Sequence, residues 1–108
     1  MPTYVSLFKY NSQALKGLMN KPSDRSQAVR QLAESVGGRL VGAYLLFGQY
    51  DGVVIFEAPD SQSAAAMMIA VGGSGAFSHV ETHEAIPAEQ GIGILERAST
   101  IAYTPPGG

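Results

Sequence analysis

Three side chains that could bind a metal or transfer protons, His79, Glu81 and His83, stand at every second position near the end of the chain. On an extended strand they would project from one face, with neighbours about 6.6 Å apart. Two of them could share an ion, whereas the two histidines, about 13 Å apart, could not. A third ligand would have to come from another strand or subunit. We therefore predict no metal site, and a solvated edge strand is the simpler interpretation.

A second candidate site is the corner GQYDG at residues 48–52. Gly48 and Gly52 suit a chain reversal, since hairpin loops commonly need positive φ. The carboxylate of Asp51 could accept backbone N–H bonds in the turn, and the Tyr50 ring could pack on the end of a sheet. A turn role explains all of these residues. The alternative is that Gly48, Tyr50 and Asp51, together with His83, line a crevice that binds a small ligand.

The third candidate site residue is Glu57, which stands at the end of a strongly apolar segment. A carboxylate directed into a covered face would have a raised pKa and could act as an acid or base. We favour a solvated position at the end of a strand. If the protein is an enzyme, Glu57, His79 and His83 are its acid–base candidates. The chain has no cysteine and no serine in a nucleophile-elbow setting, so nucleophilic catalysis has no visible apparatus and no cofactor is predicted.

The elements that would position these residues follow from periodicity and capping. Residues 3–10, 40–47, 52–58 and 77–86 favour strands, because β-branched and aromatic types are enriched or apolar residues alternate. Asn11 is predicted to cap a short helix, and Asp24 and Asp60 to begin two amphipathic helices that end at glycine pairs. A short helix is expected near residues 94–98. The sequence thus predicts one domain, 1–98, followed by a C-terminal tail, 99–108.

The order strand, helix, strand, strand, helix, strand predicts an α+β, ferredoxin-like β-α-β-β-α-β fold with a four-stranded antiparallel sheet of order 4-1-3-2. In this arrangement we expect the first and third strands to run parallel. That direction would place Asp51 at the same end of the sheet as His83, and Glu57 beside His79 at the other end. Asp51 and His83 would be about 9.6 Å apart, too far for an Asp–His dyad.

The two middle strands are apolar at both alternating sets of positions, which is typical of strands covered on both faces. The predicted helices cover only one face. We therefore expect a second copy of the chain to cover the other, as a homodimer, with a trimer or larger ring as the alternative. The formal net charge of −2 argues against nucleic acid as a partner. No apolar run could span a bilayer, and a cytoplasmic location is expected.

Three segments, MPTYVSLFKY, LAESVGGRLVGAYLLFGQYDGVVIFEAPD and ETHEA, occur in this order along the chain. Through them the sequence resembles the GYD domain family over residues 1 to 95, and more distantly the ligand-sensing domain of Lrp/AsnC-type regulators. The resemblance implies a ferredoxin-like fold similar to the dimeric α/β barrels and implies no established reaction. We expect a small homo-oligomeric module that binds a small ligand or has a regulatory role. The alternatives are a cofactor-independent monooxygenase or isomerase, and a structural module without a ligand.

Overall fold

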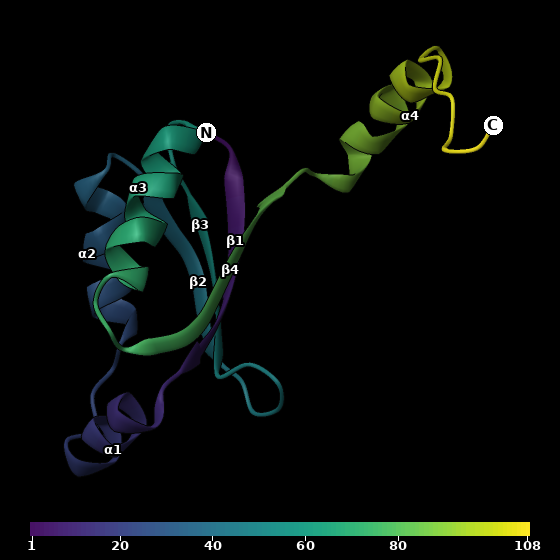
Figure 1. Cartoon of the computed structure of the whole chain (residues 1–108). Helices are drawn as coiled ribbons and strands as arrows, with labels where there is room; N and C mark the ends of the chain where they lie inside the picture. Colours follow the sequence, from purple (N-terminus) through teal and green to yellow (C-terminus); the bar gives the residue numbers. More distant parts are fainter.

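A four-stranded antiparallel sheet carries helices on one face and none on the other (Figure 1). The computed structural model describes all 108 residues. Its elements confirm the predicted α+β, ferredoxin-like order. They are β1 (Thr3–Tyr10), α1 (Ser12–Asn20), α2 (Ser26–Ser35), β2 (Arg39–Leu45), β3 (Gly52–Glu57), α3 (Ser61–Gly72), β4 (Phe77–Ala85), a short 3-10 helix η1 (Ala88–Gln90) and α4 (Gly91–Ser99).

The strand order β2-β3-β1-β4 is the predicted one, but the predicted strand directions were wrong. β1 is antiparallel to both of its neighbours, β3 and β4. The physical reason is the crossover: α1 and α2 return the chain to the end where β1 began, so β2 runs parallel to β1, and the hairpin then reverses β3. β3 and β4 therefore point the same way.

This direction changes which candidate residues share an end of the sheet. Gly52, next to Asp51, pairs with Phe8 of β1, and the adjacent Lys9 pairs with His79. Asp51 thus lies at the end that holds His79. Glu57 pairs with Thr3 at the opposite end, which is the end near His83. Both placements correct the sequence-based expectation.

The core lies between the sheet and the helices α2 and α3. Tyr4 and Phe56 face the helices from adjacent strands and stack with their ring centroids 5.4 Å apart. They pack with Ala33 of α2 and Met67 of α3, both fully buried. The predicted face of α2 is confirmed, since its apolar side chains pack against the same cluster. These side chains are Val29, Leu32 and Val36.

Two predicted helix caps are confirmed. The side chain of Asn11 accepts a hydrogen bond from the Ala14 N–H at 2.9 Å and begins α1. The Asp60 carboxylate accepts one from the Ser63 N–H at 2.8 Å and begins α3. Side-chain oxygens in this position satisfy amides that have no partner within the helix. The two helices therefore begin where the sequence predicts.

The helix-free side of the sheet presents an apolar surface, which we call the open sheet face. It is the face opposite the buried Val54 and Phe56, because side chains alternate along a strand. Cross-strand pairing places five hydrophobic side chains on it, four of them half-buried and one, Tyr44, 61% exposed. These residues are Val5, Leu7, Tyr44, Val53 and Ile55.

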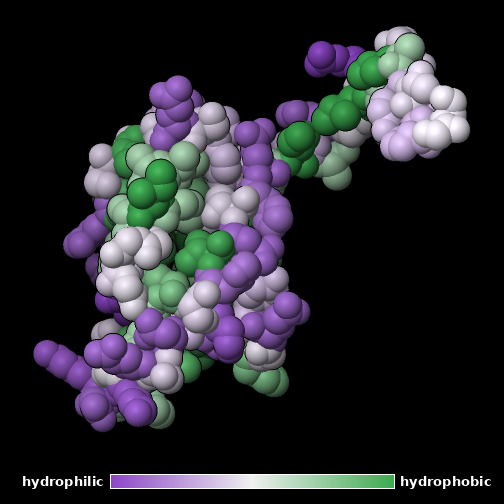
Figure 2. Space-filling model, in the orientation of Figure 1, coloured by the Kyte–Doolittle hydropathy of each residue, from purple (hydrophilic) through white to green (hydrophobic).

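After β4 the chain leaves the sheet as a projecting arm made of η1, α4 and the residues that follow (Figure 1). The helix begins three residues before the predicted position near Ile94. Hydrophobic side chains lie exposed along the arm (Figure 2). They are Ile86, Ile92, Ile94, Leu95, Ile101 and Tyr103. None of the helices has the length and apolar composition that crossing a lipid bilayer requires.

Candidate functional site

The most strongly connected polar group on the open sheet face is Glu81. Its Oε1 atom accepts a hydrogen bond from the Tyr50 hydroxyl at 2.6 Å and lies 2.9 Å from His79 Nε2. Its Oε2 atom lies 2.8 Å from His83 Nε2. Because an ionised carboxylate only accepts hydrogen bonds, both imidazoles carry their proton on Nε2 when they are neutral. We call these four residues the Glu81 cluster.

The three hydrogen bonds hold the pKa of Glu81 at about 2, and the bond from Tyr50 has the largest effect. The same bond raises the pKa of the Tyr50 hydroxyl. Glu81 therefore stays ionised through the physiological range and cannot serve as a general acid there. It orients the two exposed imidazole rings by binding their Nε2 atoms. The two Nε2 atoms bind opposite oxygens of one carboxylate, and no three His, Asp or Glu side chains are arranged to hold a metal ion.

We predict that replacing Glu81 with glutamine lowers stability in a pH-dependent way. The folded-state pKa of about 2 lies below the usual 4.5. Ionisation of Glu81 therefore stabilises the fold fully above the unfolded-state pKa, and this contribution disappears as the pH falls through the folded-state value. Thermal unfolding from about pH 6 to about pH 2.5 should show the wild type more stable at the upper end and the two proteins converging at the lower end.

Glu84→Gln is the matched control, since Glu84 is exposed on the same strand and forms no hydrogen bond through its side chain. Its unfolding temperature should stay close to that of the wild type throughout. A constant offset between wild type and Glu81→Gln at every pH would contradict the assignment.

Asp51 lies apart from the Glu81 cluster and binds the end of β1. Its Oδ2 atom accepts a hydrogen bond from the Tyr10 N–H at 2.9 Å, and its Oδ1 atom is 3.8 Å from Lys9 Nζ. Its own N–H donates to the Phe8 carbonyl at 2.8 Å, and its carbonyl accepts from the Leu46 N–H at 2.8 Å. Side chain and backbone together therefore fix the hairpin to the neighbouring strand.

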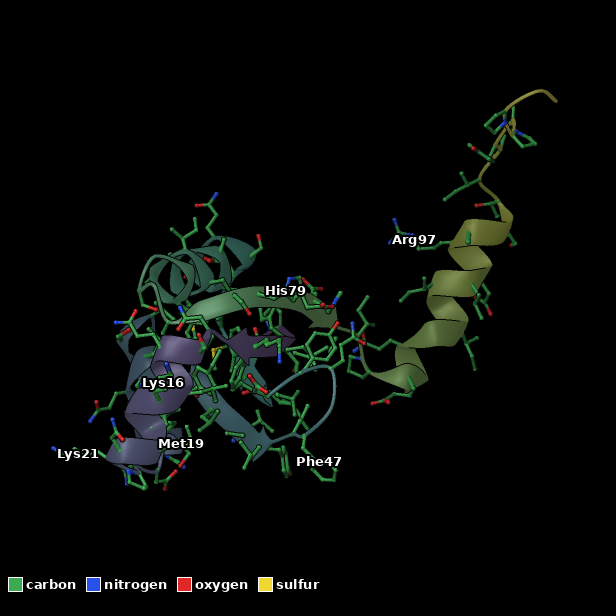
Figure 3. All side chains as sticks on the ribbon, turned by 60° about the horizontal axis from the view of Figure 1, so that its bottom comes forward. Lys16, Met19, Lys21, Phe47, His79 and Arg97 are labelled. Atoms are coloured by element: carbon green, nitrogen blue, oxygen red, sulfur yellow. The ribbon has the colours of Figure 1, made fainter.

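The two glycines of the corner have different roles. Gly48 adopts a φ of +139° in the β2–β3 loop, a conformation that side chains disfavour. Gly52 has no positive φ; a Cβ atom there would lie 2.3 Å from the Phe8 ring. Phe47 precedes the corner, fully exposed and pointing away from the body of the protein (Figure 3). The loop thus exposes the Phe47 side chain to solvent, and the hydrogen bonds of Asp51 attach the end of the loop to β1.

Glu57 forms an ion pair with Arg39, with Oε1 and Nε 2.9 Å apart. The bond to Arg39 lowers the pKa of Glu57 and raises that of Arg39. A carboxylate directed into the core would have a raised pKa, and that of Glu57 is not raised. Its side chain lies on the open sheet face at the end of β3.

The structure brings only some of the candidate site residues together. Tyr50, His79 and His83 meet around one carboxylate. Glu57 and Asp51 lie elsewhere, each bound to a different partner. Sequence reasoning missed Glu81 as the group that connects the cluster, although its place between the two histidines was the signal that could have indicated it.

Comparisons with known proteins agree with this fold. The sequence profile of the GYD domain matches residues 4–95. A Thermus thermophilus protein, described as a glutamine synthetase and cystathionine beta-lyase binding protein, is 29% identical over 96 residues, which is 89% of this chain and 100% of that protein.

Two solved structures share the fold. A crystal structure of a Thermus thermophilus protein superposes with a TM-score of 0.53 at 17% identity, covering 80% of this chain and 94% of that one. A hypothetical protein from Pyrococcus horikoshii gives a TM-score of 0.53 at 15% identity, covering 83% and 95%. These likenesses establish the ferredoxin-like architecture.

Proposed function

The chain belongs to the GYD domain family, and we propose that it is a regulatory binding module that forms a homodimer through the open sheet face and binds other proteins. The observation that carries the proposal is the open sheet face itself. Val5, Leu7, Val53 and Ile55 form a continuous apolar row across β1 and β3, with the exposed Tyr44 beside them on β2. Contiguous apolar surface of this kind is typical of interaction sites.

A second copy of the same face is the occupant that fits best. In a two-fold interface the apolar row of one subunit contacts the same row of its partner. One apolar patch on each subunit is therefore enough to form a closed dimer. Charged groups stand at the edges of the face, with the Arg39–Glu57 ion pair on one side and the Glu81 cluster on the other. An apolar centre with a polar rim is the usual anatomy of an interface. A trimer or larger ring would instead need two different, complementary patches on each subunit, because its interfaces are heterologous.

A binding role agrees with the state of the titratable groups. Glu81 and Glu57 are both engaged in hydrogen bonds that lower their pKa values. Acid–base catalysis needs a group whose pKa lies near the working pH. A monooxygenase or isomerase would need such a group in an enclosed site, whereas the side chains of His79 and His83 are 54% and 62% exposed. We propose instead that Gly48, Tyr50 and His83 contact a ligand or partner at the rim of the dimer interface, and that Asp51 maintains the loop.

Protein binding is supported by the Thermus thermophilus relative, whose description names two enzymes that it binds. We propose that the present chain binds enzymes of the same kind through the arm. Ile94 and Leu95 of α4 are exposed, and the main packing partner of this helix is the short η1 beside it. Exposed apolar helices commonly dock in grooves of other proteins. The absence of cysteine fits a reducing compartment such as the cytoplasm.

The test is a binding measurement with purified glutamine synthetase and purified cystathionine β-lyase on a biosensor surface. At least one enzyme is expected to bind the wild-type protein. The double substitution Ile94→Ser with Leu95→Ser should weaken that binding by roughly tenfold or more, because buried apolar anchors dominate interface energies. Glu96→Gln on the same helix should leave it unchanged. If neither enzyme binds the wild type, the proposed partner class is wrong; binding that the double variant retains would exclude the arm.

A further inference from the structure

The structure contains a cavity of about 520 Å³ between the sheet and its helices, and Tyr44 and Val53 of the open sheet face also belong to its lining. This volume is within the range of small-molecule sites in proteins. Its walls come from all four strands, from α1, from α2 and the segment before it, and from α3. The cavity is thus a pocket of the single chain and needs no second subunit to form it.

Small side chains help to leave this space open. Ala28 of α2 and Ala43 of β2 line the cavity where longer side chains would fill it. Helix α1 buries none of its residues and borders the cavity through Leu18 without filling it. The segment from Pro22 to Ser26 also lines the cavity. The result is a hollow whose floor is the sheet and whose rim is the start of α2.

The walls are hydrophobic and partly aromatic. Phe8 and Phe77 meet edge to face with ring centroids 5.4 Å apart, and Tyr10 stacks on Phe77 at 5.1 Å. Leu32 and Met68 line the same cavity from the helices. Such walls favour an alkyl chain or an aromatic ring, and a methionine side chain adapts to either. A sugar or a phosphate would lose its hydrogen bonds to water there, and these hydrophobic walls would not replace them.

One cation at the rim has no anionic partner. Of the charged residues that line the cavity, Asp24 accepts two hydrogen bonds from Ser26, at 3.0 and 2.6 Å. Asp51 is bound to the Tyr10 N–H and lies near Lys9. Arg25 lines the cavity, is exposed, and forms no ion pair. Arg25 is therefore the cationic side chain of the lining that is free to pair with an anion.

We propose that this cavity binds an amphipathic carboxylate, with its alkyl or aromatic tail between Phe77 and Met68 and its carboxylate on Arg25. A guanidinium recognises a carboxylate through two parallel hydrogen bonds. Burial raises the pKa of the Tyr10 hydroxyl against the opposing effect of the nearby Arg25. This hydroxyl stays protonated and can donate to the same headgroup. The proposal goes beyond the dimer interface proposed above, with which the cavity shares Tyr44 and Val53.

Decanoate is the probe, and calorimetric titration of the full-length protein is the measurement. Binding of decanoate is expected to be tighter than binding of decanol, which has the same tail without the charge, and decyltrimethylammonium is expected to bind least. Arg25→Gln should weaken decanoate binding by roughly tenfold, the effect of losing a charged hydrogen bond, and leave decanol binding unchanged. Arg30→Gln, an exposed arginine of α2 outside the cavity, is the matched control and should change neither.

Ala28→Phe tests the location, since its ring would occupy the cavity, and Gln27→Phe places the same ring on the exposed side of α2. Decanoate binding should be lost in the first variant and kept in the second. Equal binding of decanoate and decyltrimethylammonium, or an Arg25→Gln affinity equal to the wild type, would overturn the proposal, as would undiminished binding to folded Ala28→Phe. If Ala28→Phe does not fold, the Arg25→Gln comparison decides alone.

Discussion

Replacing Ile55 with aspartate is expected to convert the proposed homodimer to folded monomers. Ile55 lies near the middle of the open sheet face, with Val5 and Gly42 as its cross-strand neighbours. In a two-fold interface the substitution would bury two carboxylates close to the axis without partners. We expect the dissociation constant to rise by roughly a hundredfold or more, since an unpaired buried charge costs several kcal/mol. Sedimentation velocity at micromolar concentration would measure it.

Ile69→Asp is the matched control, because Ile69 is 75% exposed on α3, on the other side of the sheet. It introduces the same charge and should leave the dimer intact. Circular dichroism should show both variants folded, as neither side chain belongs to the buried core. A wild-type protein that sediments as a monomer, or an Ile55→Asp variant that stays dimeric, would show that the open sheet face is not the interface.

The helices and strands could be predicted from the sequence because they depend on interactions between residues close together in the chain. Val29, Leu32 and Val36 are spaced so that one helix face is apolar, and that face packs on the core. Asn11 and Asp60 cap helices with the side-chain geometry that their residue types favour. Periodicity and capping depend on neighbours a few residues away. Such features can be derived from one sequence without knowledge of the tertiary structure.

The candidate site could be predicted only in part, because its contacts depend on tertiary structure. The alternation of His79, Glu81 and His83 placed them on one strand face, as observed. Nothing local indicates that Tyr50, thirty-one positions before Glu81 in the chain, donates to the same carboxylate. The error in strand direction also misplaced Asp51 relative to the histidines. The helix-side cavity could not be predicted, since tertiary packing brings its lining together from four strands and three helices.

The sequence identifies Gly52 as a residue of the corner but suggests the wrong physical reason for a glycine there. The sequence suggests a glycine that permits positive φ in a turn, but Gly48 alone in this corner has that conformation. Gly52 is required because the Phe8 ring lies where its Cβ would be. Close approach across strands depends on the register of β1 and β3, which the local sequence does not specify. The sequence therefore shows that a glycine occupies this position, and the structure shows why the position requires one.

Replacing Asp51 with alanine is expected to lower the free energy of unfolding by about 2 kcal/mol. A hydrogen bond to a charged group contributes roughly 1.5–3 kcal/mol, and its loss leaves the Tyr10 N–H without its partner. The Lys9 ammonium, 3.8 Å from Oδ1 and half exposed, adds little. For a chain of 108 residues this corresponds to a melting temperature lower by roughly 10 °C, which differential scanning calorimetry would measure.

Two further variants separate the carboxylate's role in the fold from a role in binding. Asp51→Asn keeps an oxygen that can accept from the Tyr10 N–H, so it should recover part of the lost stability. Gln49→Ala, an exposed neighbour in the same loop, should unfold with the wild type. If Asp51→Ala instead melts with the wild type, the carboxylate does not fasten the loop to β1. Its presence in the corner would then have to be explained by what binds there, because the backbone bonds to Phe8 and Leu46 would hold the hairpin without it.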